Sequence, residues 1–155
     1  MRLLKEGIEA GTASHRPASQ RPIAIKARHF MTKNVVVLRE RQTLAEALHV
    51  LVTRKLSGAP VLDSHGKVVG ILSEFDCMKI LVASSFHHEG RPKQRQVSEL
   101  MTTDLHDVSP DTDVYTIAHM FIAHRIRRVP VVEHGRLVGI VSRRDILRVM
   151  HAHAA

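Results

Sequence analysis

APVLDSHGKVVGILSEFD, residues 59–76, is the stretch that decides the fold. Two β-rich runs, 59–63 and 67–72, flank the three residues Ser64, His65 and Gly66. A three-residue loop that ends in glycine is typical of a bulged β-hairpin, because glycine readily takes the left-handed backbone conformation there. The stretch therefore predicts two antiparallel strands.

The same pattern returns as VPVVEHGRLVGIVSRRD, residues 129–145. Here only His134 and Gly135 separate the two β-rich runs, and a two-residue loop ending in glycine is another standard hairpin connection. The second copy has thus lost one residue at the hairpin tip, which changes the turn without shifting the strands. This internal repeat predicts two segments of one fold.

Helix signals surround both hairpins in the same order. Thr43 to Glu46 reads as a capping box before an apolar stripe at helical spacing, and Asp113 is the matching N-cap of the second repeat. Short strands are expected before these helices, at 35–38 and 105–109, and a second helix after each hairpin, from Ser73 and from Ser142. Each repeat reads β-α-β-β-α, which gives an α+β fold class.

The composition limits the broad class of protein. The chain has 155 residues with 44% hydrophobic and 25% charged residues, ordinary values for a globular protein. Its formal net charge of +8 indicates an anionic partner: a phosphorylated small molecule, a nucleic acid or an acidic protein surface. A single cysteine, no apolar run long enough for a membrane span and no secretory signal favour a cytoplasmic protein without membrane association.

The two repeats together resemble the CBS domain family. The resemblance rests on Met-Thr before the first strand, Pro-Val in the second strand, and Gly-Ile-Leu/Val-Ser-x-x-Asp after the third, each present twice in register. It implies two CBS repeats packed with pseudo-twofold symmetry, known as a Bateman module. We expect a flexible basic arm over 1–27, repeats over 28–83 and 97–151, and a linker over 84–96.

The resemblance implies a regulatory module, not an enzyme, that binds AMP, ADP, ATP or S-adenosylmethionine in clefts between the repeats, with no cofactor and no metal. It also implies a homodimer and a regulated protein of unknown identity. The first cleft would be formed by residues of both repeats: Asn34, Val35, Val36, Ser57, Gly58, Ala59, Ser142, Arg144 and Asp145. We expect Asp145 to bind the ribose, and Ser142 and Arg144 to bind phosphate.

The second cleft is the symmetry-related counterpart of the first. Its expected residues are Ser73, Asp76, Asp104, Leu105, His106, Arg127, Arg128 and Val129. Glu74 and Phe75 stand where the other repeat has Arg143 and Arg144, so this cleft is less suited to phosphate. The Ser-x-x-Asp motif also has a purely structural explanation as a helix cap, and both roles stay open.

Other candidates are weaker. The chain has 12 histidines, but His87-His88 and His151 with His153 lack further ligands at metal-binding spacing. Cys77 is expected to be buried and inert, and Met31 and Met101 are expected to pack in the core. Two alternative functions remain: a basic nucleic-acid-binding protein, which the low aromatic content of 3% argues against, and a dimeric scaffold with empty clefts.

Overall fold

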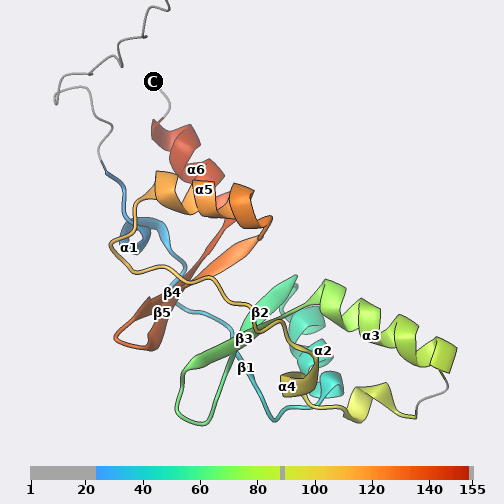
Figure 1. Ribbon diagram of the computed structural model, residues 1–155. Helices are drawn as coiled ribbons and strands as arrows, with labels where there is room; N and C mark the ends of the chain where they lie inside the picture. Colours follow the sequence, from blue (N-terminus) through green and yellow to red (C-terminus); the bar gives the residue numbers. More distant parts are fainter. Residues whose placement is uncertain (1–23, 88–89, 154–155) are drawn as a thin grey trace, which may run out of the picture.

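The computed structural model describes residues 24–87 and 90–153, which form two units joined along their sheets (Figure 1). The elements in chain order are α1 Ala27–Phe30, β1 Leu38–Arg39, α2 Leu44–Thr53, β2 Gly58–Leu62, β3 Val68–Ser73, α3 Glu74–His87, the 3-10 helix η2 Pro92–Gln94, α4 Val97–Leu100, α5 Val114–His124, β4 Arg128–Glu133, β5 Arg136–Ser142 and α6 Arg143–His153.

Each unit is a small sheet with two long helices, so the expected α+β repeat is confirmed. In the first unit the strand order is β1-β2-β3, with β1 parallel and β3 antiparallel to β2. In the second unit β4 and β5 form an antiparallel pair, and Val108 makes a parallel bridge to Val131 at the place of β1. The strands expected at 35–38 and 105–109 are thus shorter than predicted, because within these segments only Leu38 and Val108 pair with a neighbouring strand.

The two hairpin turns have the backbone conformations that their lengths require. Gly66 has φ of +80° in the three-residue loop. In the two-residue loop both His134 and Gly135 have positive φ, +51° and +76°, as a type I′ turn demands. The second hairpin, with one residue fewer at its tip, therefore has a different type of tight turn from the first.

The predicted N-caps also form. The Thr43 side chain accepts a hydrogen bond from the Glu46 backbone N–H at 3.2 Å, which caps α2. Asp113 accepts bonds from the Tyr115 and Thr116 backbone N–H groups, both at 3.0 Å, and one from the Thr116 hydroxyl at 2.6 Å. These bonds, that from the Thr116 hydroxyl above all, hold the pKa of Asp113 below its ordinary value.

Replacing Asp113 with alanine is expected to lower the free energy of unfolding by about 1 kcal/mol at pH 7, the usual loss for an N-cap. A carboxyl whose pKa is lowered by folding stabilises the protein above its unfolded pKa, about 3.9, and loses this effect as the pH falls through the folded value. Urea unfolding at pH 7 and pH 3 measures both effects. This role of Asp113 would be contradicted if wild type and Asp113→Ala had the same free energy of unfolding at pH 7, or if their difference were equally large at pH 3.

The units are interlocked, because the short helix that precedes the first strand of each unit packs in the core of the other unit (Figure 1). Ala27 of α1 packs in the core of the second unit, and the Thr32 backbone bonds to Ile140 on β5. In the same way, Leu100 of α4 packs in the core of the first unit and Thr102 bonds to Ile71 on β3. The sequence repeats are therefore not the packing units.

Met31 and Met101, which follow these short helices, lie over glycines of the central strands. A Cβ atom on Gly139 would lie 2.8 Å from Met31 Cγ, and one on Gly70 would lie 2.7 Å from Met101 Cγ. The predicted packing role of both methionines is confirmed, since each contacts a hydrophobic core.

Two predicted boundaries differ from the structure. Residues 84–87 were expected in the linker but belong to α3, because the helical hydrogen bonding continues to His87. Residues 24–27 were expected in the mobile arm, yet Ile25 contacts the second core and Ala27 is fully buried there. The rest of the predicted arm lies outside the described residues. Among the helices described, none has the length and apolar character needed to cross a bilayer.

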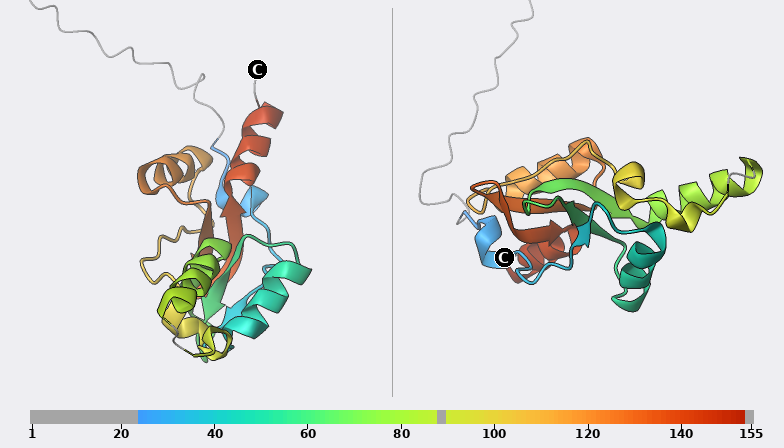
Figure 2. Two further views of the ribbon diagram at one scale, coloured as in Figure 1. Left: turned by 90° about the vertical axis from the view of Figure 1, so that its right-hand side faces the viewer. Right: turned by 90° about the horizontal axis from the view of Figure 1, so that it is seen from below.

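The long helices lie on the outside of the sheets, and the sheets meet between the units (Figure 2). Four parts of the chain matter for function: the carboxyl ends of β3 and β5, and the segments that enter β2 and β4. These parts come together on either side of the contact between the units, where two clefts form.

Candidate functional site

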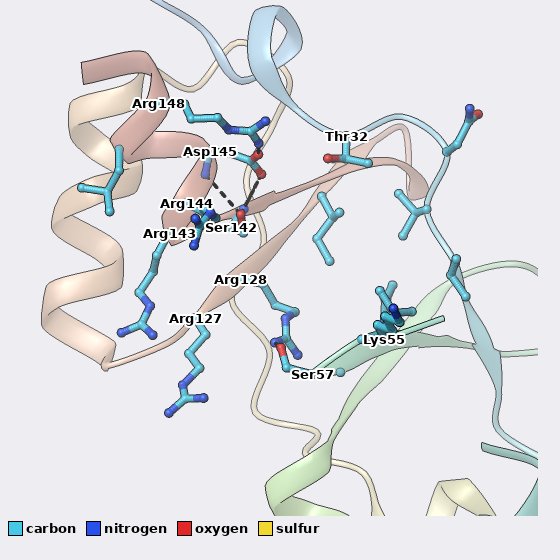
Figure 3. Close-up of a pocket in the computed structure, with 18 residues that line it drawn as sticks. Thr32, Lys55, Ser57, Arg127, Arg128, Ser142, Arg143, Arg144, Asp145 and Arg148 are labelled. Carbon is cyan, nitrogen blue, oxygen red and sulfur yellow. Dashed lines mark hydrogen bonds and ion pairs between the residues drawn. The ribbon is translucent and has the colours of Figure 1, made fainter. Parts of the chain in front are cut away.

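The larger cleft, with a volume of about 720 Å³, lies between the start of α6 and the first strand region of the other repeat (Figure 3). This volume falls within the usual range for small-molecule sites, roughly 300–1,000 Å³. We call it the basic cleft. It is lined by Thr32, Asn34, Val35, Val36, Lys55, Leu56, Ser57, Gly58, Pro60, Arg127, Arg128, Ile140, Ser142, Arg143, Arg144, Asp145, Leu147 and Arg148.

Ser142 and Asp145 form a reciprocal cap at the start of α6, which is the structural role that the motif predicts. Asp145 Oδ2 accepts bonds from the Ser142 backbone N–H at 2.8 Å and from the Ser142 hydroxyl at 3.0 Å. In return, the Asp145 backbone N–H donates to Ser142 Oγ at 3.2 Å. The cap fixes both side chains at the mouth of the cleft.

The remaining carboxylate oxygen of Asp145 points away from the cap and forms an ion pair with Arg148, one helical turn later. The Asp145 side chain is almost fully buried, whereas the Arg148 side chain is 71% exposed. This ion pair contributes little to stability, because the long Arg148 side chain is largely exposed to solvent. Oδ1 of Asp145 is therefore held by an exposed side chain and not by the helix cap.

The opposite wall of the basic cleft contains most of the residues expected there. Asn34, Val35, Val36, Ser57 and Gly58 all line it. The placement of Ala59 in this cleft was wrong. Its side chain is 1% exposed and packs in the core of the first unit, because every residue of β2 is buried and Ala59 faces the inner side of the sheet.

The basic cleft has a strongly positive wall. Its cationic side chains come from three places along the chain and are Lys55, Arg127, Arg128, Arg143, Arg144 and Arg148. Among the residues that the structure describes, Asp145 contributes the one carboxylate of this cleft. In addition, the backbone N–H groups at the start of α6 give that end of the helix a partial positive charge. The cleft is therefore suited to a ligand with several negative charges.

The second cleft has a volume of about 610 Å³ and mixed charge. Its lining includes the expected residues Ser73, Asp76, Asp104, Leu105, His106, Arg127 and Arg128. Val129 was expected here but is fully buried, because its side chain packs in the core of the second unit. The carboxylates of Glu74, Asp76 and Asp104 offset most of the charge of Lys79, Arg125, Arg127 and Arg128.

Asp76 repeats the cap geometry of Asp145. Its Oδ2 accepts from the Ser73 backbone N–H at 3.0 Å and from the Ser73 hydroxyl at 2.9 Å. Its Oδ1 lies 3.4 Å from Lys79 Nζ. In the same cleft the His106 ring stacks on His124, with ring centroids 3.8 Å apart. The two clefts thus share one scaffold but differ in charge.

Several lining residues were missed by the sequence interpretation. Arg148 lies one turn after Asp145 on the same helix face, so the spacing alone could have indicated it. Lys55 lies just after α2 with a positive φ of 53°, and only the folded chain brings it to the cleft. Arg127 and Arg128 were assigned to the second cleft alone, but they line both.

The remaining candidates are Cys77 and the histidines. Cys77 is 2% exposed in the core of the first unit, which confirms its predicted burial, and burial raises the pKa of its thiol. Within residues 24–87 and 90–153, no three histidine, cysteine or acidic side chains come together as a metal site would need. His88 lies outside the described residues.

Comparison with known proteins gives one family. The family model described as "CBS domain" matches residues 27–83 and 97–152. Among curated relatives, an inosine-5′-monophosphate dehydrogenase from Methanocaldococcus jannaschii is 32% identical over 124 residues, which cover 79% of this chain. The chain spans only 23% of the length of that dehydrogenase.

Solved structures of similar fold include two with bound adenosine compounds. CBSX2 in complex with AMP has a TM-score of 0.71 and 28% sequence identity, and the match covers 82% of this chain and 96% of that one. The paired domains of MJ0100, in complex with 5′-methylthioadenosine and S-adenosyl-L-methionine, have a TM-score of 0.72 and 26% identity, covering 83% and 98%.

Proposed function

This chain belongs to the CBS domain family, and from that premise we propose that it is a regulatory module that binds an adenosine nucleotide in the basic cleft. The observation that carries the proposal is the pairing, in one cleft, of a buried carboxylate with a dense cationic wall. A nucleotide needs both: an acceptor for the ribose hydroxyls and several donors for phosphate oxygens.

Each part of the nucleotide has a matching part of the cleft. Asp145 Oδ1 accepts the ribose hydroxyls once Arg148 has moved away from it. The Ser142 hydroxyl and the start of α6 lie beside the phosphates, with Arg144 as a bidentate donor. Val35, Val36 and Pro60 provide apolar surface for the adenine ring.

Two structural neighbours support the choice of ligand class, since CBSX2 binds AMP and MJ0100 binds 5′-methylthioadenosine and S-adenosyl-L-methionine. The relative with dehydrogenase activity is matched over less than a quarter of its length, so its activity does not carry over to this chain. We therefore propose that the module acts by binding alone, and that its output passes to a partner protein or to a second copy.

Thermal unfolding with added ligands tests the proposal. A ligand at about 100 times its dissociation constant adds roughly 2.7 kcal/mol of stability, which shifts the midpoint by several degrees for a chain of this size. We expect a shift with AMP, ADP or ATP, and no shift with GTP at the same concentration. No response to any adenosine compound, together with salt-sensitive binding of RNA or DNA, would reject the nucleotide proposal in favour of a nucleic-acid-binding protein.

We further propose a homodimer that forms through the long helices. Both units expose large apolar side chains on these helices, among them Val52 on α2 at 73% exposure and Ile122 on α5 at 78%. An apolar groove of about 460 Å³ between α2 and α3 is lined by Leu48, Val52, Met78 and Leu81, among others. Since the two units have the same fold, a second copy can present the equivalent face, as a twofold interface requires.

Replacing Ile122 with glutamate is expected to convert the dimer to a monomer, because it places a charge in an apolar contact. Sedimentation equilibrium measures the association. The matched control is Lys67→Glu, an exposed change at the hairpin tip that leaves the helices untouched. A wild-type chain that sediments as a monomer would refute the proposed dimer.

A further inference from the structure

The two repeats differ in size and charge at the entries to β2 and β4. At the entry to β2 the first repeat has Ser57 and Gly58, and at the equivalent entry to β4 the second repeat has Arg127 and Arg128. Two small residues therefore oppose two long cations at one point of the interface.

The Arg128 side chain crosses this point and reaches the other repeat (Figure 3). Its Nη2 donates a hydrogen bond to Ser57 Oγ. Its guanidinium occupies the space that a side chain at position 58 would take, because a Cβ atom on Gly58 would overlap Arg128 Nη1 and lie 3.1 Å from Cζ. The glycine in the first repeat thus makes room for the arginine of the second.

Arg128 is a partly buried cation without a direct ion-pair partner among the described residues. Among the described residues, its guanidinium forms no ion pair with a carboxylate, and the Ser57 hydroxyl is its hydrogen-bond partner. Burial lowers the pKa of Arg128, the neighbouring charges of Arg127 and Arg143 lower it further, and Glu74 partly opposes them. Arginine stays protonated in proteins, so the cost of burying this charge is reduced by a nearby anion and not by loss of the proton.

Arg128 also forms part of the wall of both clefts, as do Ser57 and Arg127. The guanidinium therefore lies within reach of a ligand on either side. Its donors can form a planar pair of hydrogen bonds with one phosphate group at a time, because the guanidinium presents its donors in a fixed plane.

We propose that Arg128 is a phosphate-binding residue shared by the two clefts, and that a phosphorylated ligand in the basic cleft thereby weakens the binding of a second phosphorylated ligand in the other cleft. The proposal rests on the proposed nucleotide-binding function and adds a rule for how the two sites act together. An adenosine ligand without phosphate makes no use of Arg128, so the coupling is confined to anionic ligands.

Calorimetric titration of the full chain with AMP and with adenosine tests this rule. The wild-type chain is expected to bind one AMP tightly and a second at least about 10-fold more weakly, whereas adenosine shows no such coupling. In Arg128→Gln the tighter AMP affinity is expected to fall about 10-fold or more, the usual effect of removing a hydrogen bond to a charged group. Adenosine affinity is expected to stay the same.

Two further variants complete the experiment. Arg136→Gln removes the same charge from an exposed position at the start of β5 and is expected to leave both affinities unchanged. Arg128→Lys keeps the charge without the planar donor pair and is expected to lie between wild type and Arg128→Gln. The thermal unfolding midpoint of Arg128→Lys, compared with that of wild type, tests whether the interface is intact.

The outcomes separate the two proposals. Unchanged AMP affinity in Arg128→Gln, or an equal loss of AMP and adenosine affinity, overturns the role of Arg128 and leaves the nucleotide-binding function standing. Two AMP molecules bound with equal affinity to the wild-type chain overturn the coupling. A wild-type chain that binds neither AMP nor adenosine overturns the proposed function, and the shared role of Arg128 falls with it.

Discussion

Replacing Asp145 with alanine is expected to weaken the binding of an adenosine nucleotide at least about 10-fold, since hydrogen bonds to a charged group contribute roughly 1.5–3 kcal/mol. The carboxylate is almost fully buried, its Oδ2 fixes Ser142, and its Oδ1 is the proposed acceptor for the ribose once Arg148 has moved away. Alanine removes both functions at once. Calorimetric titration of the variant with ATP measures the loss.

The same substitution also removes a helix cap, so the variant needs a control with the same structural cost. Asp76→Ala provides it, because Asp76 caps α3 through equivalent bonds to Ser73. Both variants are expected to lose stability of about 1 kcal/mol. Only Asp145→Ala is expected to lose nucleotide affinity in the basic cleft. Equal nucleotide affinity in wild type and Asp145→Ala would remove this carboxylate from the site.

Gly139→Val is expected to destabilise the fold by about 2–3 kcal/mol, because it overpacks a filled contact between the two halves of the chain. Met31 lies against Gly139 so closely that even a Cβ atom would sit 2.8 Å from Met31 Cγ. The added atoms push Met31, and with it α1, out of the core of the second unit. Urea unfolding measures the change in the free energy of unfolding.

A double variant shows whether this contact is the cause. In a chain that already carries Met31→Ala, Gly139→Val is expected to cost less than half as much, because the space it needs is free. Gly90→Val is the matched control: apart from its two chain neighbours, no atom of the described residues would lie within 4 Å of a Cβ atom on Gly90. An effect of Gly90→Val as large as that of Gly139→Val would contradict the packing explanation, and so would equal costs in the two backgrounds.

The repeats, hairpins and caps could be predicted from the sequence because they depend on residues close together in the chain. Gly66 and the pair His134-Gly135 determine their turns through backbone conformation, and Thr43 and Asp113 cap the helices that they precede. Such local signals are the same in the sequence and in the folded chain.

The exchange of short helices between the units could not be predicted in this way. Ala27 precedes the first unit but packs in the core of the second, and Leu100 precedes the strands of the second unit but packs in the core of the first. No local sequence pattern indicates which of the two cores each short helix joins. The errors at Ala59 and Val129 have a related cause. Residues 59–62 and 129–132 are apolar without alternation, so the sequence does not reveal which of these side chains face the cleft.

The shared position of Arg128 depends on the contact between the two units. The sequence places Arg128 at the entry to β4, but its reach depends on Gly58, 70 positions earlier, whose missing side chain leaves the space. Arg148 shows the opposite case, since its spacing from Asp145 places it on the same helix face. The positive charge of the basic cleft was thus underestimated from the sequence, which placed only Arg144 among its cationic residues.

Nucleotide binding between the repeats is tested most directly by mapping bound ATP on the backbone amide spectrum of the full chain by heteronuclear magnetic resonance. The largest shifts are expected on the amides that surround the basic cleft, at 34–36, 57–58 and 142–145. Shifts confined to the outer faces of the helices, or no shifts at millimolar ATP, would contradict nucleotide binding between the repeats.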